Sequence, residues 1–260
     1  TNTNNIMNMT SSKKFALITG GSRRIGAAIC RNLHKAGIDI MIHYRNSKED
    51  AITLQKELNN IREDSACLVQ ANLLEFESYE YIIKEMISSF GNIDFLINNA
   101  SSFYPTKVGD ISSEHWEDLI STNLKAPLFL SQFAYPYLKK NKGAIVNITD
   151  ARIADPKKGY AVYSLAKSGL ENLTKSLAND LGPDIRVNAV APGAIIWPEI
   201  DSQYGRHSQE YDKKYRDEVI NQSILKRLGE PADIAKAVEF LLLNAPFVTG
   251  ETISVDGGRH

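Results

Sequence analysis

Short apolar segments alternate with longer amphipathic segments along most of the chain, from Phe15 to Val255. The short segments are nearly continuous runs of Ile, Val and Leu, which is typical of strands buried on both faces of a parallel sheet. Seven segments have this pattern, namely residues 15–19, 38–44, 66–70, 93–98, 144–148, 185–190 and 252–255.

The segments between these strands predict helices, because their apolar residues recur at helical spacing. They lie near residues 25–35, 48–61, 76–90, 113–139, 160–181 and 231–243. Gly37, Gly91 and Gly182 follow three of them, where a helix end favours a residue that accepts a positive φ. Seven strands with six crossovers predict an α/β fold in a single domain: a Rossmann-type, doubly wound, parallel seven-stranded sheet with helices on both faces.

Residues 191–222 contain no clear element, and helical spacing is present only in their later part. Long irregular segments in compact domains are usually lids or mobile loops. We therefore expect a substrate lid at about 194–222, with an insertion of no function as the alternative. The polar residues 1–12 predict a disordered leader, which leaves one folded domain over residues 13–260.

Composition narrows the classes of partner. The net charge of -1 argues against nucleic acid or an anionic membrane as the main partner. No apolar run approaches the ~20 residues that cross a bilayer, and the leader lacks the pattern of a signal peptide. Cys30 and Cys67 lie in predicted core elements and form no CxxC pair, so we expect buried, reduced thiols in a cytoplasmic protein without a metal site.

The sequence TGGSRRIG at residues 19–26 follows the first strand and begins the first helix. Glycines let the backbone approach a pyrophosphate, and the helix N-terminus supplies free N–H groups. After the second strand, HYRNS at residues 43–47 lacks the acidic residue that would bind the ribose diol of NAD. Arg45, Ser47 and the nearby Arg23 instead favour the 2′-phosphate of NADP(H).

Tyr163 and Lys167 are four residues apart on a predicted helix and therefore share one face. We expect the lysine cation, together with the positive nicotinamide of the oxidised cofactor, to lower the pKa of the phenol and to ease proton donation. Asn123 lies inside another predicted helix, where it is either a kink that holds a water for a proton relay or an exposed polar residue.

These motifs, in this order, resemble the short-chain dehydrogenase/reductase family over roughly residues 14–258. NNAS at 98–101, APG at 191–193 and VDGG at 255–258 complete the resemblance. It implies catalytic roles for Asn123, Tyr163, Lys167 and the residue at 150. It also implies cofactor contacts from Gly20, Ser22, Arg23, Arg24, Ile25, His43, Tyr44, Arg45, Ser47, Asn72, Leu73, Asn99, Ala100, Ser101, Pro192 and Gly193.

Three departures make the chain most similar to the pteridine reductases of that family. Arg24 stands where most relatives carry Gly, Asp150 replaces the usual catalytic Ser, and Phe103 lies in a similar segment after the fourth strand. By this resemblance, a pterin would stack on Phe103 and contact Arg24, Ser101, Asp150, Tyr163 and Trp197. A carboxylate suits ring nitrogens and amino groups, because it accepts hydrogen bonds from N–H donors.

The implied activity is reduction of dihydropterins, and also of dihydrofolate, by hydride transfer from NADPH with proton delivery from Tyr163 and Asp150. The alternatives are a 3-oxoacyl or other carbonyl reductase of the same family and, more remotely, a non-catalytic NADP-binding redox sensor. Asn72 departs from the Asp that commonly meets adenine in the family. Relatives form homotetramers, and the tail Arg259-His260 either frays or reaches a neighbouring subunit.

Overall fold

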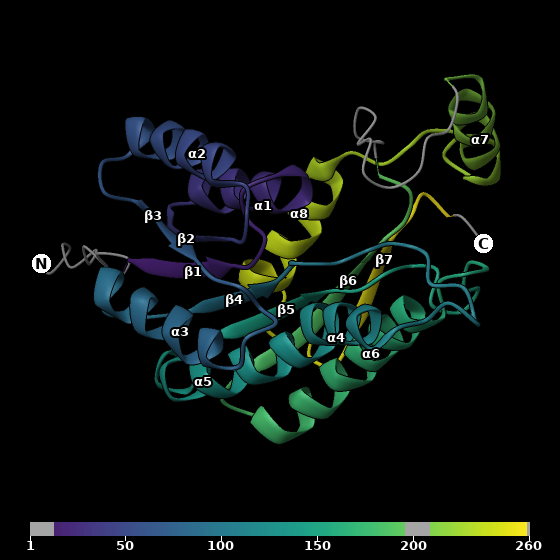
Figure 1. Ribbon diagram of the computed structural model, residues 1–260. Coiled ribbons are helices and arrows are strands. Elements are labelled where there is room, and N and C mark those ends of the chain that lie inside the picture. The colour runs from purple at the N-terminus through teal and green to yellow at the C-terminus, as the bar shows by residue number, and fades with distance from the viewer. Residues whose placement is uncertain (1–12, 196–208, 259–260) are drawn as a thin grey trace, which may run out of the picture.

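The sheet contains seven parallel strands in the order β3-β2-β1-β4-β5-β6-β7 (Figure 1). The computed structural model describes residues 13–195 and 209–258. Strand order runs outward in opposite directions from the central β1–β4 pair, which confirms the doubly wound fold. The strands are β1 (Lys14–Ile18), β2 (Ile38–Tyr44), β3 (Ala66–Gln70), β4 (Phe95–Asn98), β5 (Ala144–Ile148), β6 (Arg186–Pro192) and β7 (Thr252–Val255).

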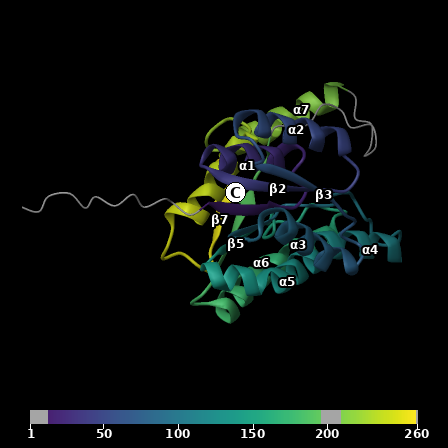
Figure 2. The same ribbon diagram turned by 90° about the vertical axis from the view of Figure 1, so that its left-hand side faces the viewer.

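Helices cover both faces of the sheet (Figure 2). One layer contains α1, α2 and α8, and the other contains α3, α4, α5 and α6. The helices are α1 (Arg24–Lys35), α2 (Lys48–Ile61), α3 (Glu77–Phe90), α4 (Ser113–Ile120), α5 (Ala126–Asn141), α6 (Ala161–Leu181), α7 (Gln209–Gln222) and α8 (Pro231–Glu239).

Each central strand contributes to two apolar cores. In β2, Ile40 and Ile42 pack toward α1, α2 and α8, whereas Met41 packs toward α3 and α5. All three side chains are fully buried. Successive side chains on a strand point to opposite faces, so a strand covered by helices on both sides needs apolar residues at nearly every position. This explains the continuous apolar runs of the sequence.

Two of the predicted helices contain irregular turns. The predicted helix at 113–139 consists of α4, a π-helical turn η1 (Ser121–Lys125) and α5. The last predicted helix likewise ends in a second π-helical turn, η2 (Phe240–Asn244). Such turns are rare and frequently occur at functional sites. Here η1 contains Asn123.

Gly37 and Gly91 have φ angles of 89° and 73°, as predicted for residues past helix ends. The same prediction is wrong for Gly182, which has a φ of -68° and a ψ of 150°. Pro183 follows it, and a residue before proline is restricted to extended conformations.

Several predictions concern residues that the structure does not describe. The leader 1–12, Trp197 and the tail Arg259-His260 lie outside the described residues, as does the lid segment 196–208. The later part of the predicted lid forms α7, which stands away from the sheet (Figure 1). None of the helices in the described ranges has both the length and the apolar character needed to cross a membrane.

Both cysteines are free thiols. Cys30 is fully buried, and burial raises the pKa of its thiol. Cys67 is only partly buried, contrary to the prediction, because it lies on β3 at the edge of the sheet.

Candidate active site

Two positions in the turn between β1 and α1 have no room for a side chain. A Cβ on Gly26 would lie 2.1 Å from the carbonyl oxygen of Gly20, and a Cβ on Gly20 would lie 2.9 Å from Cα of Ala100. Gly20 also has a φ of 59°. Glycine is therefore required at both positions, and the backbone comes close enough to the surface to meet a pyrophosphate.

The segment after β4 holds this turn in place. The hydroxyl of Thr19 accepts hydrogen bonds from the backbone N–H groups of Asn99 and Ala100, both at 3.0 Å. The Asn99 amide donates in return to the carbonyl oxygens of Thr19 and Gly20, also at 3.0 Å. Asn99 and Ala100 thus support the cofactor turn from below, whereas Thr19, which connects them, was not singled out in the sequence.

His43 braces the same turn from β2. Its Nδ1 accepts from the backbone N–H of Gly20 at 3.1 Å, and its Nε2 lies 3.1 Å from the carbonyl oxygen of Ala71. With Nδ1 as acceptor, the neutral ring carries its proton on Nε2 and donates it to Ala71. Burial lowers the pKa of His43 to about 4, which keeps the ring neutral. The side chain is only 2% exposed, so it acts beneath the turn rather than on its outer surface.

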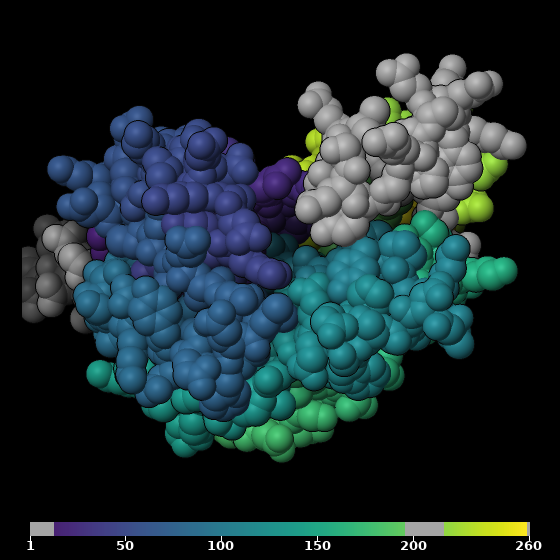
Figure 3. Space-filling model, viewed as in Figure 1, coloured from purple at the N-terminus to yellow at the C-terminus, as the bar shows by residue number. Residues whose placement is uncertain are grey.

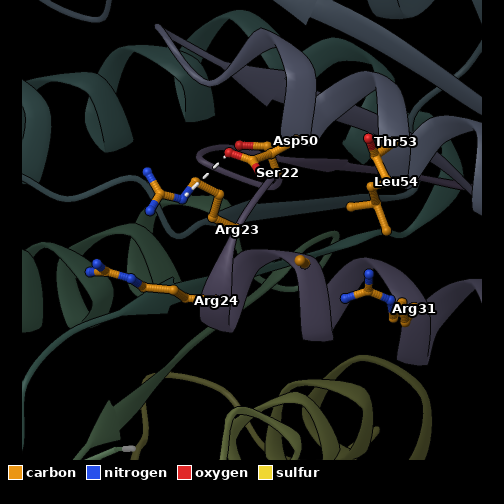
Figure 4. Close-up of a pocket in the computed structure, with 8 residues that line it drawn as sticks. Ser22, Arg23, Arg24, Arg31, Asp50, Thr53 and Leu54 are labelled. Atoms are coloured by element: carbon orange, nitrogen blue, oxygen red, sulfur yellow. Dashed lines mark ion pairs between the residues drawn. The ribbon is translucent and has the colours of Figure 1, made fainter. Parts of the chain in front are cut away.

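The predicted 2′-phosphate region lies where this turn meets the loop after β2. The hydroxyls of Ser22 and Ser47 are 2.7 Å apart. Arg23 Nε lies 3.5 Å from Asp50 Oδ2 on α2 (Figure 4). Arg45 Nη1 lies 3.5 Å from Asp118 Oδ1 on α4. Both arginines are therefore near the predicted site, but each faces a carboxylate of this chain.

A cavity of about 330 Å³ adjoins this region. Its walls come from the turn, α1 and α2, and Figure 4 shows Arg23 turned toward Asp50 while Arg24 lies apart from that pair. The surface is hollowed where the turn reaches it, beside the lobe that carries α2 (Figure 3). The cavity is lined by Ser22, Arg23, Arg24, Ala27, Arg31, Asp50, Thr53 and Leu54.

Arg24 adopts a φ of 50°, which is unusual for a residue with a side chain. The left-handed conformation costs a non-glycine residue roughly 1–2 kcal/mol. Glycine would accept this conformation without that cost, so the turn has a backbone shape that suits glycine although it carries Arg24. Ile25 follows it in the first turn of α1 and packs against the core.

Asn72 and Leu73 follow β3, where the sequence predicts an adenine contact. The Asn72 side chain makes local bonds, donating to Glu75 at 3.2 Å and accepting from the backbone N–H of Leu74 at 3.3 Å. Leu73 is buried against α3, and Tyr44 is buried at the end of β2. The adenine contact remains a prediction.

Asp150, Tyr163 and Lys167 meet above the end of β5. Tyr163 Oη donates to Asp150 Oδ2 at 2.8 Å, and Asp150 Oδ1 accepts from the backbone N–H of Arg152 at 2.8 Å. Lys167 Nζ donates to the carbonyl oxygen of Ile148 at 2.9 Å and lies 5.9 Å from the centre of the Tyr163 ring. The sequence therefore identified three side chains that the fold brings together.

Among the described residues, Lys167 does not bring the pKa of Tyr163 below its ordinary value, and the predicted lowering by Lys167 together with the oxidised nicotinamide stays a prediction. Burial, and then the Asp150 carboxylate, raise the pKa of the Tyr163 phenol above its ordinary value. Burial also lowers the pKa of Lys167 to about 8, with the negative charge of Asp150 acting in the opposite direction. The phenol thus keeps its proton and donates it in a hydrogen bond to the Asp150 carboxylate, so the two side chains act on a ligand together.

Asn123 is fully buried, which excludes the alternative of an exposed helix residue. Its amide donates to the carbonyl oxygens of Leu119 and Ser102, each at 2.9 Å, and its Oδ1 accepts from Ser101 Oγ at 2.7 Å. Both N–H donors are used, so a water for the predicted relay has only Oδ1 of this side chain to bind. Ser101, expected at the cofactor or substrate, faces Asn123 instead.

Phe103 lies beside the catalytic pair. Its ring stacks on Tyr160 with centroids 4.8 Å apart and meets the Tyr163 ring edge-on at the same distance. Phe103 remains 50% exposed, which is a large fraction for an aromatic side chain in a loop. Tyr160 was missed because it stands at the start of the predicted helix 160–181 and belongs to no motif; in the structure it is the residue that precedes α6. The position of Phe103 is compatible with stacking on a flat ligand.

The end of β6 closes this region from the other side. The carbonyl oxygen of Pro192 accepts from the backbone N–H of Ala151 at 3.0 Å, directly beside Asp150. The N–H of Gly193 donates to Val255 at 2.9 Å, and a Cβ on Gly193 would lie 2.5 Å from Cα of Asp256. The segment that leads into the predicted lid is therefore fixed close to the catalytic carboxylate.

Comparison with known proteins identifies the family. The family model adh_short_C2, described as enoyl-(acyl carrier protein) reductase, matches residues 20–260. This chain belongs to the short-chain dehydrogenase/reductase family. It is an oxidoreductase of that family, and the predicted Rossmann-type fold is confirmed.

Similar proteins within the family carry the names of different enzymes. The chain is 36% identical over 250 residues to 3-oxoacyl-(acyl-carrier-protein) reductase FabG of Staphylococcus aureus strain Mu50, covering 95% of this chain and 98% of the relative. It is 33% identical over 283 residues to pteridine reductase 1 of Leishmania tarentolae, covering 94% and 95%. It is 32% identical over 254 residues to short chain dehydrogenase mdpC of Emericella nidulans, covering 94% of each.

Proposed function

We propose that this family member reduces pterins with NADPH, and that Asp150 is the residue that selects them. The observation that carries the proposal is the hydrogen bond of 2.8 Å from Tyr163 Oη to Asp150 Oδ2. A carbonyl oxygen needs a donor, yet here the phenol proton already faces a carboxylate. A ring with N–H groups offers what this pair can accept, and its imine nitrogen can take the proton that the pair shares.

The turn after β1 suits a dinucleotide, because Gly20 and Gly26 let it close tightly on itself and on Ala100 between a strand and a helix N-terminus, which is the arrangement that receives a pyrophosphate. Ser22, Ser47 and Arg45 would hold a 2′-phosphate, and Arg23 adds a second cation. When bound, NADPH supplies the hydride that reduces an imine carbon of the dihydropterin. The absence of a carboxylate within residues 43–47 supports NADPH over NADH.

The residues of this chain then control the proton. Tyr163 and Asp150 deliver one proton to the ring nitrogen next to the reduced carbon, and the charge of the pair is restored from Lys167. Lys167 suits this role because burial lowers its pKa to about 8, close to neutrality. Phe103 would orient the flat ring, since stacked rings gain ~0.5–1.5 kcal/mol beyond the area they bury.

Reduction of a 3-oxoacyl thioester is the second candidate. Overall identity favours it, because the chain is 36% identical to the staphylococcal 3-oxoacyl reductase and 33% identical to the pteridine reductase. On the comparisons alone this alternative is better supported than the pterin. Asp150 argues in the other direction, because a carboxylate beside a carbonyl oxygen repels the negative charge that develops there.

Initial rates of NADPH oxidation with dihydrobiopterin, dihydromonapterin, dihydrofolate and acetoacetyl-CoA separate the two candidates. We expect kcat/KM to be at least about tenfold higher for the best dihydropterin than for the thioester, since one charge-assisted hydrogen bond contributes about 1.5–3 kcal/mol. A higher kcat/KM for acetoacetyl-CoA would overturn the pterin proposal. Binding of NADPH without turnover of any substrate would instead support a redox sensor.

We also propose a homotetramer with a lid over the substrate. Exposed apolar side chains lie on the outer surface of α4–α6, namely Trp116, Leu128 and Leu165. Buried in contacts between copies, they would stabilise an assembly. Light scattering on the purified protein should give four copies, and a monomer would contradict this. The lid at 194–222, with α7 as its described part, and the cytoplasmic location remain predictions.

A further inference from the structure

An ion pair joins the predicted 2′-phosphate region to the helix layer beneath the substrate site. Arg45 Nη1 lies 3.5 Å from Asp118 Oδ1, and these side chains are 48% and 21% exposed. Arg45 follows β2, whereas Asp118 belongs to α4. The contact therefore connects two segments that are distant in the sequence.

The backbone of Arg45 is fixed, and among the described residues its guanidinium pairs with Asp118. Gln70 donates from its side chain to the carbonyl oxygen of Arg45 at 3.0 Å. Ser47, two residues later, is bonded to Ser22 in the cofactor turn at 2.7 Å. Any change of partner for Arg45 is therefore a movement of its side chain rather than of the loop.

We propose that Asp118 is a specificity-determining residue, which competes with the 2′-phosphate of the cofactor for Arg45. The inference rests on the proposed use of NADPH. A carboxylate and a phosphate are both strong acceptors for a guanidinium, and one Nη group cannot be fully directed at both. Asp118 thus weakens binding of 2′-phosphorylated nucleotides and leaves binding of nucleotides without that phosphate unchanged.

The expected effect of Asp118 on nucleotide affinity follows from the solvent exposure of the Arg45–Asp118 pair. Ion pairs that are reached by solvent contribute little, so their loss changes an equilibrium by a factor of about two to five. Lys125, the nearest lysine along the chain toward α5, lies 6.0 Å from the Phe76 ring and is engaged there. Removing the Asp118 charge therefore acts through Arg45.

The experiment measures binding of 2′,5′-ADP and 5′-AMP by calorimetry, because these probes differ only in the 2′-phosphate. Asp118→Asn should tighten 2′,5′-ADP about two- to fivefold and leave 5′-AMP unchanged. Glu117→Gln is the matched control: it removes the same charge from the next, exposed position of α4 and should change neither probe. Thermal unfolding of both variants checks that the fold is retained.

A second variant, Arg45→Ala, distinguishes failure of this inference from failure of the proposed function. Arg45→Ala should weaken 2′,5′-ADP, and Asp118→Asn added to it should then bring no gain. Unchanged or weaker binding of 2′,5′-ADP by Asp118→Asn overturns the inference, as does equal tightening of both probes. If Arg45→Ala leaves 2′,5′-ADP binding unchanged, the assignment of the 2′-phosphate to Arg45 fails as well.

Discussion

The two ends of the proposed site, the β1–α1 turn and the Asp150–Tyr163 pair, are stabilised in different ways. At the β1–α1 turn, Thr19, His43 and Asn99 make hydrogen bonds almost entirely to backbone groups. At the catalytic end, the ionisable side chains of Tyr163 and Asp150 bond to each other. The first arrangement fixes a backbone shape, whereas the second directs a phenol proton at a carboxylate.

Burial lowers the pKa of a basic side chain at each end, but only one of the two groups then titrates near neutral pH. It lowers the pKa of His43 to about 4, so this ring stays neutral and keeps one hydrogen-bond pattern over the physiological range. It lowers the pKa of Lys167 to about 8, so this ammonium group titrates close to neutrality. The pH dependence of the enzyme should therefore arise at the catalytic end and not at the cofactor turn.

The largest expected effect is the loss of kcat in Tyr163→Phe, which changes the catalytic end alone. The variant keeps the ring that meets Phe103 but removes the hydroxyl that bonds Asp150. Loss of a positioned acid–base group lowers kcat by about 10²–10⁴-fold, while NADPH affinity should be unchanged. Stopped-flow turnover and NADPH titration measure the two quantities. An equal loss of NADPH affinity would show that the ends are not separate.

The second prediction concerns the alkaline pH range. If the ammonium form of Lys167 is needed, kcat/KM falls about tenfold per pH unit once the pH exceeds about 8. Asp150 raises the pKa of Lys167, so Asp150→Asn should move this decrease to lower pH. Rate profiles of both proteins between neutral and alkaline pH test this. A shift to higher pH would contradict the assigned sign.

Lys167 also makes the stability of the folded state depend on pH. The pKa of Lys167 is lower in the folded protein than its ordinary 10.5, so between about 8 and 10.5 the unfolded chain binds more protons. This group alone therefore makes the folded state more stable as pH rises through that range. Its burial penalty is fully present below about 8.

At the cofactor end, His43→Leu should lower stability. It leaves the N–H of Gly20 and the carbonyl oxygen of Ala71 without their partner, which costs about 1–3 kcal/mol. Urea unfolding measures this loss, and NADPH affinity should fall while kcat at saturation is retained. His43→Gln, which offers one acceptor and one donor, is the control and should restore part of the loss. Full stability of His43→Leu would show that the ring is not a brace.

The smallest effect on stability is expected for Arg24→Gly. Glycine accepts a φ of 50° without strain, but it adds entropy to the unfolded chain, so the two contributions nearly cancel. We expect a net change below about 1 kcal/mol in the free energy of unfolding. KM for the dihydropterin should rise if the guanidinium contacts it. Loss of the fold would mean that Arg24 supports the turn.

Much of the scaffold could be predicted from the sequence, because local patterns determine it. Strands buried on both faces need continuous apolar residues, and a turn that meets a pyrophosphate needs glycine at positions such as Gly26. The family resemblance likewise placed Asp150, Tyr163 and Lys167 together. All of these features can be read from a short stretch of sequence or from a family motif.

The features that were missed depend on contacts between distant segments. Nothing near Asp118 indicates that it faces Arg45, and nothing near Tyr160 indicates that it stacks on Phe103. The raised pKa of Tyr163 likewise follows from burial and from the exact direction of one carboxylate, which no motif specifies. These contacts lie around the proposed cofactor and substrate positions, and this explains why fold and family were easier to predict than the substrate.

The most direct test of the central claim is the substrate preference of Asp150→Ser. The quantity is the ratio of kcat/KM for dihydrobiopterin to kcat/KM for acetoacetyl-CoA, measured in the variant and in the unchanged protein. If Asp150 selects a ring with N–H groups, the ratio should fall about ten- to a hundredfold, as expected for loss of one charge-assisted hydrogen bond. An unchanged or higher ratio would contradict the account and leave a carbonyl reductase in which Asp150 does not determine the substrate.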